Sequence, residues 1–238
     1  MNIDRIDGET MIFALILTGG LENTNKNETP RPFLKLGDKP ILIQTIEKFC
    51  IISDFDEIIV LTSKDWIKYT EELINSHIPK HDIKVIGSGL LRIDSINNGM
   101  DYIIDNYGLE DHIIVTHDAV RPFVTYKIIK ENIEKAEEFG ACNTIIPATD
   151  TIVESKDSNI ISKIPNRNHM YQGQTPQSFK LKRLKEYYDN LKDDEKNQLT
   201  DACKLFVLNN DDVAIVPGEI ANIKITYDYD LKLANKLL

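Results

Sequence analysis

Cysteine, tryptophan and long apolar runs are scarce in this 238-residue chain. Its three cysteines, Cys50, Cys142 and Cys203, are widely spaced and form no metal-ligand pattern, which favours reduced core thiols in a cytoplasmic protein. No apolar run approaches the roughly 18 residues that a membrane-spanning helix needs. The first ten residues carry three acidic side chains and no basic-then-apolar order, so we expect a polar extension rather than a signal peptide.

Positive charge is also in deficit. The chain has 28 lysines and arginines against 38 aspartates and glutamates, a formal net charge of −10. A protein that binds nucleic acid in general needs a basic face, so this balance argues against that class. A local basic pocket for one small anion remains compatible with it. The length suits one sizeable α/β domain or two small ones.

The common glycine-rich fingerprints of nucleotide-binding folds are missing as well. Thr18-Gly19-Gly20 follows the first expected strand with neither the GxGxxG nor the Walker spacing. This absence disfavours a Rossmann dehydrogenase. Because glycine has no Cβ, the backbone at Gly19 and Gly20 still allows a ligand to approach closely.

The first two thirds of the chain alternate between short apolar runs and amphipathic stretches with a helical period. The expected strands are residues 12–17, 57–62, 83–86, 111–116 and 142–147. The expected helices are residues 41–49, 64–76 with Ser63 as the N-cap, 92–107, and 127–139 with Gly140 as the C-cap. This alternation predicts an α/β fold with a mainly parallel sheet flanked by helices on both faces.

The pattern changes after Pro147. Residues 149–154 and 160–164 are short, alternating segments with a polar stretch between them, which predicts a β-hairpin arm within residues 148–175. Such an arm must bury its apolar side, and a second subunit is one candidate partner, so we expect a homodimer.

The remaining segments are expected to complete the same domain. A polar loop is expected at Gln174–Phe179, and Thr200 is a candidate N-cap for a helix. The other expected elements are helices at residues 181–191 and 228–238, and strands at residues 213–216 and 223–225.

The motif His117–Phe123 follows the central expected strand and carries Asp118 and Arg121. In open α/β sheets, ligands bind outside the carboxyl ends of the strands. A carboxylate at that place can hold a hard cation such as Mg²⁺, and an arginine can grip a phosphate with two hydrogen bonds. An isolated Asp-x-x-Arg is also compatible with a structural ion pair.

Seven motifs in order resemble those of the cytidylyltransferases that make CDP-alditols. The motifs are Leu17–Gly20, Pro30–Leu34, Ser88–Ser95, His117–Phe123, Gln174–Phe179, Thr200–Ala202 and Asn222–Thr226. The resemblance runs from about Met11 to the C-terminus. The two close branches of this family act on ribitol 5-phosphate and on 2-C-methyl-D-erythritol 4-phosphate. The run Met170–Phe179 is more similar to the ribitol branch, whose product feeds teichoic-acid or capsule synthesis of the cell wall.

The resemblance implies a single Rossmann-like domain of the nucleotidyltransferase type over residues 11–238, with residues 1–10 outside it. It implies that an alditol phosphate, most simply D-ribitol 5-phosphate, attacks the α-phosphorus of CTP, with Mg²⁺ as cofactor and pyrophosphate as leaving group. The nucleotide-binding residues would be Leu17, Thr18, Gly19, Gly20, Gly89, Ser95, Asp118 and Ala119, with Asp118 also binding the metal. Arg31 and Lys224 would be catalytic. Arg121, Thr151 and Arg167 would bind the alditol phosphate, the last two reaching in from the partner subunit's arm.

The first loop departs from the family pattern, which reads Gly-Gly-x-Gly-x-Arg-Met and then Pro-Lys-Gln-Phe. The residues that replace the third glycine and the arginine, methionine, lysine and glutamine are Glu22, Thr24, Asn25, Arg31 and Pro32. Thr24 removes a cation that should stabilise the leaving group, a loss of roughly 10²–10³ in rate. Arg31 keeps the positive charge of the family's lysine but carries it on a planar guanidinium instead of a compact ammonium. Lys26 is a candidate to replace the cation that Thr24 removes.

Three functions therefore stay open on the sequence. The first is an active ribitol-5-phosphate cytidylyltransferase with an altered nucleotide loop. The second is the methylerythritol-phosphate enzyme of isoprenoid synthesis. The third is a catalytically weakened homologue that binds nucleotide without turnover. Because the departures are confined to one loop and the acceptor side is intact, activity is favoured.

Overall fold

The computed structural model describes residues 10–19, 29–196, 199 and 201–238. The strands of the main sheet are β1 (Ile12–Leu17), β4 (Glu57–Thr62), β5 (Ile83–Gly87), β6 (Ile113–Asp118), β7 (Ala141–Pro147), β8 (Tyr171–Lys180) and β9 (Ala214–Pro217). The helices are α1 (Ile41–Cys50), α2 (Ile67–His77), α3 (Arg92–Tyr107), α4 (Tyr126–Phe139), α5 (Leu181–Asp189), α6 (Asp193–Lys196), α7 (Cys203–Leu208) and α8 (Asp228–Leu237). A small hairpin pairs β2 (Lys35–Leu36) with β3 (Lys39–Pro40).

The strand order of the seven-stranded sheet is β5-β4-β1-β6-β8-β7-β9. Strands β5, β4, β1 and β6 are parallel neighbours, and β9 is parallel to β7. Only β8 breaks the pattern, because it runs antiparallel to both β6 and β7. The predicted α/β fold with a mainly parallel sheet is confirmed.

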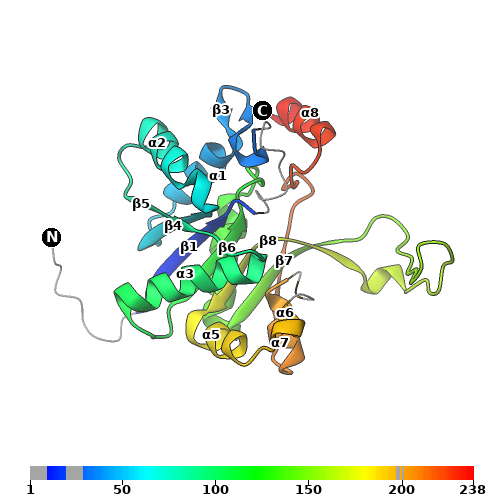
Figure 1. Ribbon diagram of the computed structural model, residues 1–238. Helices are drawn as coiled ribbons and strands as arrows, with labels where there is room; N and C mark the ends of the chain where they lie inside the picture. The colour runs from blue at the N-terminus through cyan, green and yellow to red at the C-terminus, as the bar shows by residue number, and fades with distance from the viewer. Residues whose placement is uncertain (1–9, 20–28, 197–198, 200) are drawn as a thin grey trace.

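The two faces of the sheet are covered by different helices (Figure 1). Along β1, Ala14 and Ile16 pack into a core with α1, α2 and α4. Phe13, Leu15 and Leu17 point to the opposite face and pack with α3, α5 and α7. Side chains alternate between the faces of a strand, so a run that is apolar at every position requires cover on both sides. Strand β1 is apolar at every position because both of its faces are covered by helices.

Several predicted boundaries are wrong in detail. Ser63 precedes a 3-10 turn, η3 (Lys64–Trp66), and its side chain makes no capping hydrogen bond. The helix itself begins at Ile67. Residues 223–225 form no strand; the Ile225 N–H donates one hydrogen bond to the Val120 carbonyl at 2.9 Å. By contrast, Gly140 ends α4 with φ 86°, as a glycine C-cap predicts.

The segment Gln174–Phe179, predicted as a polar loop, lies inside strand β8. Its polar side chains are buried with partners. Thr175 Oγ1 lies 3.0 Å from His117 Nδ1, and Gln177 Nε2 donates to Asp201 Oδ2 at 2.7 Å. Buried polar groups are acceptable in a core once they are hydrogen-bonded. The prediction of a loop here is wrong, because it rested on the polarity of the segment alone.

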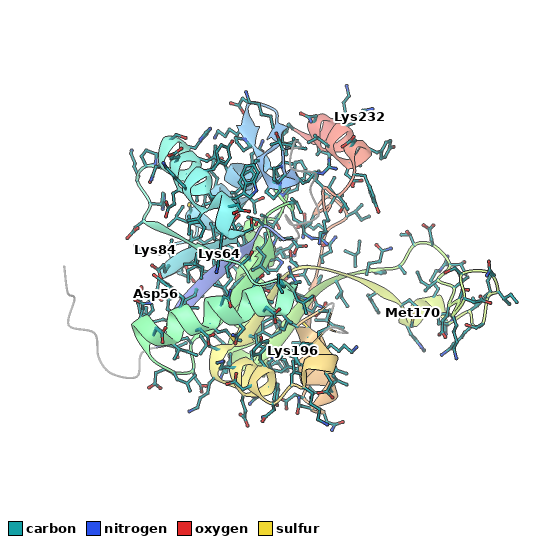
Figure 2. The ribbon with its side chains drawn as sticks, in the orientation of Figure 1. Asp56, Lys64, Lys84, Met170, Lys196 and Lys232 are labelled. Atoms are coloured by element: carbon teal, nitrogen blue, oxygen red, sulfur yellow. The ribbon has the colours of Figure 1, made fainter. Side chains whose placement is uncertain are left out.

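A long arm projects from the sheet between β7 and β8 (Figure 1). Its base is regular, because Ile145–Pro147 pairs antiparallel with Tyr171–Gly173. Its outer part departs from the predicted hairpin of residues 149–154 and 160–164, with one isolated bridge between Glu154 and Lys163. Figure 2 shows Met170 on this arm. The exposed large apolar side chains of the outer arm are Val153, Ile160, Ile161 and Ile164.

Among the helices of the described ranges, none combines the length and apolar character required to cross a bilayer. The expected polar extension of residues 1–10 falls almost wholly outside the described residues, as does the expected N-cap Thr200.

Candidate active site

Strand β6 carries Asp118 to the edge of a cavity. The sequence placed Asp118 just past the strand, whereas β6 extends through Asp118, which lies opposite Leu17 of β1 in the parallel register. The Ala119 N–H then donates to the Leu17 carbonyl at 2.9 Å. This pairing fixes the backbone of Asp118 at the carboxyl end of the sheet, where ligands bind in such folds.

The cavity has a volume of about 880 Å³ and opens between β1, the 3-10 turn η2 (Arg31–Phe33), the loop before α3, and the start of α8. It brings together most of the residues expected to bind nucleotide or to act in catalysis. Those that line it are Leu17, Thr18, Gly19, Arg31, Gly89, Ser95, Asp118 and Lys224.

Four predicted residues do not line this cavity. Ala119 is fully buried in the core, and its carbonyl accepts from Thr45 Oγ1 at 2.8 Å. Arg121 is buried, and its Nε donates to Asp118 Oδ2 at 3.1 Å. Thr151 and Arg167 are exposed on the arm, where Arg167 Nη1 donates to the Thr149 carbonyl at 3.1 Å.

The remaining expected contact of the nucleotide loop, Gly20, lies outside the described residues. So do the departures of that loop and the candidate substitute cation: Glu22, Thr24, Asn25 and Lys26.

Three cationic side chains converge on the Asp118 carboxylate. Arg92 Nη1 lies 2.6 Å from Oδ1, and Arg121 Nε and Lys224 Nζ lie 3.1 and 3.2 Å from Oδ2. Burial on its own raises the pKa of the Asp118 carboxyl, but the charges of Arg92, Lys224 and Arg121 outweigh it and hold that pKa well below its usual range. Asp118 is therefore ionised at neutral pH, and three cations share one negative charge.

His117 fixes the backbone on either side of Asp118. Its Nε2 lies 3.1 Å from the Arg121 carbonyl, which only accepts, so Nε2 carries the proton. Burial lowers the pKa of His117 to about 4, so Nδ1 is free to accept from the Thr175 hydroxyl. The Thr175 oxygen in turn accepts from the Asp118 N–H at 3.1 Å. Sequence patterns alone predict no individual role for His117 or Thr175.

The loop before α3 forms part of the cavity wall. A Cβ added to Gly89 would lie 2.4 Å from the Asp94 Cβ, so only glycine fits there. The Gly89 N–H donates to Ser95 Oγ at 3.1 Å, and Ser95 Oγ donates to the Leu91 carbonyl at 3.1 Å. The loop is thus held tightly against the helix start.

Arg31 and Asp228 form an ion pair on the cavity wall. Arg31 Nη1 donates to Asp228 Oδ1 at 2.7 Å, and the hydrogen bond from Arg31 holds the pKa of the Asp228 carboxyl below its usual value. The Asp228 side chain is 87% exposed, so salt and water weaken this pair. Sequence reasoning missed both Asp228 and Arg92.

This mainly parallel sheet, with a cavity lined by cationic side chains at its carboxyl end, defines a nucleotidyltransferase-type domain. The profile of the family "IspD: 2-C-methyl-D-erythritol 4-phosphate cytidylyltransferase" matches residues 12–238. The chain belongs to this family, and it is a CTP-dependent cytidylyltransferase.

Solved structures of similar proteins agree with this assignment. The 4-diphosphocytidyl-2C-methyl-D-erythritol synthase of Anaerococcus prevotii superposes with a TM-score of 0.80 at 25% identity, covering 96% of each chain. The Francisella tularensis 2-C-methyl-D-erythritol 4-phosphate cytidylyltransferase gives 0.77 at 26% identity, covering 96% of this chain and 100% of that one. The Thermus thermophilus enzyme, at 23% identity and a TM-score of 0.70 over 94% and 96% of the chains, shares the fold. The ribitol branch, with its teichoic-acid and capsule context, finds no support among these matches.

Proposed function

We propose that this enzyme transfers the cytidylyl group of CTP to 2-C-methyl-D-erythritol 4-phosphate. The family match over residues 12–238 supports this acceptor. The observation that carries the proposal is the group of three cations around Asp118 at the edge of a cavity of about 880 Å³. Two polyanionic substrates must meet in this reaction, and such a cavity offsets their charge.

In the proposed reaction, a phosphate oxygen of the acceptor forms a bond to the α-phosphorus of CTP. The bond from that phosphorus to the bridging oxygen breaks, and the electron pair leaves with pyrophosphate. No protein nucleophile is required, because positioning and electrostatic stabilisation supply the catalysis. Lys224 is assigned to the α-phosphate and Arg31 to the nucleotide phosphates. Arg121 does not line the cavity, so its assignment to the acceptor phosphate requires its guanidinium to turn away from Asp118 and the Asn222 carbonyl. Gly19 and Gly89 bring backbone groups close to the nucleotide.

A divalent cation fits this site in one way. No group of three or more acidic, histidine or cysteine side chains suited to a metal occurs in the described ranges. Two carboxylates line the cavity, Asp118 at the end of β6 and Asp228, which is paired with Arg31 on the wall. Mg²⁺ is commonly held by one or two carboxylates together with substrate phosphates, so Asp118 would hold it jointly with CTP. When bound, the cation neutralises charge on the nucleotide phosphates.

The proposal includes a homodimer in which the arm of each subunit completes the acceptor site of the other. Thr151 and Arg167 lie on the arm and do not line the cavity of their own chain, and apolar side chains such as Ile160 and Ile164 are exposed on the same arm. Burial of these side chains against a second copy would stabilise the pair, at about 25 cal/mol for each Å² of apolar surface.

The test is pyrophosphate release from CTP and Mg²⁺, run in parallel with 2-C-methyl-D-erythritol 4-phosphate and D-ribitol 5-phosphate. We expect the methylerythritol phosphate to be favoured by at least about tenfold in kcat/KM. The resemblance of Met170–Phe179 to the ribitol branch makes ribitol phosphate the second candidate, and faster release with it would reverse the assignment. CTP binding with release from neither acceptor would support the weakened homologue.

A further inference from the structure

Arg92 contacts the central carboxylate more closely than any other cation described. It is the first residue of α3, and its Nη1 lies 2.6 Å from Asp118 Oδ1. Its Nη2 atom is buried and has no hydrogen-bond partner among the described residues. A buried donor without a partner costs stability, so such a group in a native fold requires an explanation.

The three cations differ in how firmly they are held at Asp118. The Lys224 side chain is 49% exposed, and the structure describes no other ion-pair partner for it. Arg121 is 10% exposed and has a second anchor, because its Nη1 donates to the Asn222 carbonyl at 2.8 Å. Arg92, at 25%, pairs with the other carboxylate oxygen. Lys224 is therefore the cation best able to turn from Asp118 to a phosphate.

The departure of Lys224 would be unfavourable if Asp118 depended on it. The Asp118 side chain is only 8% exposed, and a buried carboxylate that loses its partner is strongly destabilised. When Lys224 leaves Oδ2, Arg121 remains on that oxygen and Arg92 on Oδ1, so the carboxylate keeps a charge-assisted hydrogen bond at each oxygen and its orientation.

We propose that Arg92 is a positioning residue that holds Asp118 so that Lys224 can leave this carboxylate for the phosphates of the bound nucleotide. This inference rests on the proposed role of Lys224 at the α-phosphate. In the alternative, Arg92 contacts the nucleotide directly. The two differ in one respect: an effect exerted through Lys224 disappears when Lys224 is removed, whereas a direct contact does not.

The experiment is a double-mutant cycle on nucleotide affinity without metal. Arg92→Met, Lys224→Met and the double variant of the full chain are titrated calorimetrically, in EDTA, with a CTP analogue that has a methylene group in place of the α,β-bridging oxygen. We expect Arg92→Met to weaken binding about tenfold in the wild-type background and less than about threefold in the Lys224→Met background, within the range of couplings in one salt-bridge network. Arg183→Met, which removes a partly exposed pair with Asp211 at 3.3 Å, is the matched control and should leave the affinity unchanged.

An equal loss from Arg92→Met in both backgrounds would overturn the inference in favour of direct contact. If Lys224→Met alone leaves the affinity unchanged, the proposed role of Lys224 fails, and this inference fails with it. Urea unfolding of each variant checks the fold. Should Arg92→Met not fold, Arg92→Lys takes its place, with a smaller loss that again requires Lys224.

Discussion

The Asp118 carboxylate organises its surroundings by attraction. Arg92, Arg121 and Lys224 all lie within 3.2 Å of it, so the cluster carries more positive than negative charge. Three cations would repel one another at the edge of an empty cavity without this carboxylate. Asp118 therefore has two tasks in the proposed enzyme: it gathers the cations, and it would hold the divalent cation together with the nucleotide.

Replacement of Asp118 by asparagine separates charge from shape. We expect Asp118→Asn to lower kcat with Mg²⁺ by about 10²–10³, in line with the loss of one electrostatic contact at a reacting phosphate. Metal-free affinity for the nucleotide analogue should stay the same or increase, because a negative charge has been removed. Steady-state pyrophosphate release measures the first, and calorimetry the second. Asp82→Asn, which alters an 85% exposed carboxylate paired with Lys84, is the control, and full Mg²⁺-dependent activity of Asp118→Asn would remove Asp118 from the metal site.

Strand β8 illustrates how a polar sequence becomes a central strand. It lies between β6 and β7, and its carboxyl-terminal part is buried despite Gln174, Thr175, Gln177 and Ser178. Each of these side chains has a partner elsewhere in the fold. Hydrogen bonds made at a distance therefore specify this strand, rather than local apolar periodicity.

Removal of one such partner should destabilise the whole domain. Gln177 is 2% exposed, and its Nε2 donates to Asp201 Oδ2 at 2.7 Å and to Asn143 Oδ1 at 3.2 Å. We expect Gln177→Ala to lower the free energy of unfolding by about 1–3 kcal/mol, because Asn143 Oδ1 and Asp201 Oδ2 both lose the donor. Urea unfolding measures the change. Gln172→Ala, at an exposed position of the same strand, is the matched control, and an equal effect of both variants would contradict this account.

The same contrast explains how much of the fold the sequence predicts. Apolar runs such as Ile12–Leu17 and the C-cap Gly140 were placed correctly, because their signals are local. Strand β8 was missed because its polar residues resemble a loop. Residues 223–225 are predicted as a strand but form none, because a short apolar alternation becomes a strand only where a neighbouring strand is available for pairing.

The candidate site follows the same division. Asp118 and Gly19 are predicted from their places at strand ends, which mark ligand sites in parallel sheets, whereas Gly89 is predicted from the family resemblance. The pair of Arg31 with Asp228 joins side chains 197 positions apart, and the contact of Arg92 with Asp118 spans 26. Neither contact can be predicted from a local sequence pattern, because only folding brings these residues together.

The molecule as a whole separates its cationic cavity from its arm. In the proposed dimer, Arg167 serves the partner's cavity, so an intact site needs Asp118 from one chain and Arg167 from the other. As a single variant, Arg167→Ala should raise the KM for the acceptor phosphate and have little effect on CTP binding. When Arg167→Ala subunits exchange with Asp118→Asn subunits, activity should be restored, because each heterodimer then has one intact site.

Equal mixing with free exchange predicts about a quarter of the wild-type activity, from simple pairing statistics of a twofold dimer. The measurement is pyrophosphate release before and after exchange, with analytical ultracentrifugation to establish the assembly. Arg183→Ala mixed with Asp118→Asn controls for nonspecific rescue. Activity that never exceeds the sum of the separate variants would place Arg167 outside a shared site, and a monomer at micromolar concentration would count against the dimer.

The cations around Asp118 also govern how the substrates approach. The whole chain has a formal net charge of −10, so a polyanion such as CTP is repelled from most of the surface. The attraction of the cavity is confined to about the Debye length, roughly 8 Å at physiological ionic strength. Moderate salt should therefore speed the encounter by screening the surface, while it weakens the final complex. Capture of the nucleotide becomes a short-range event, in which the rates of association and dissociation respond to ionic strength in the same direction.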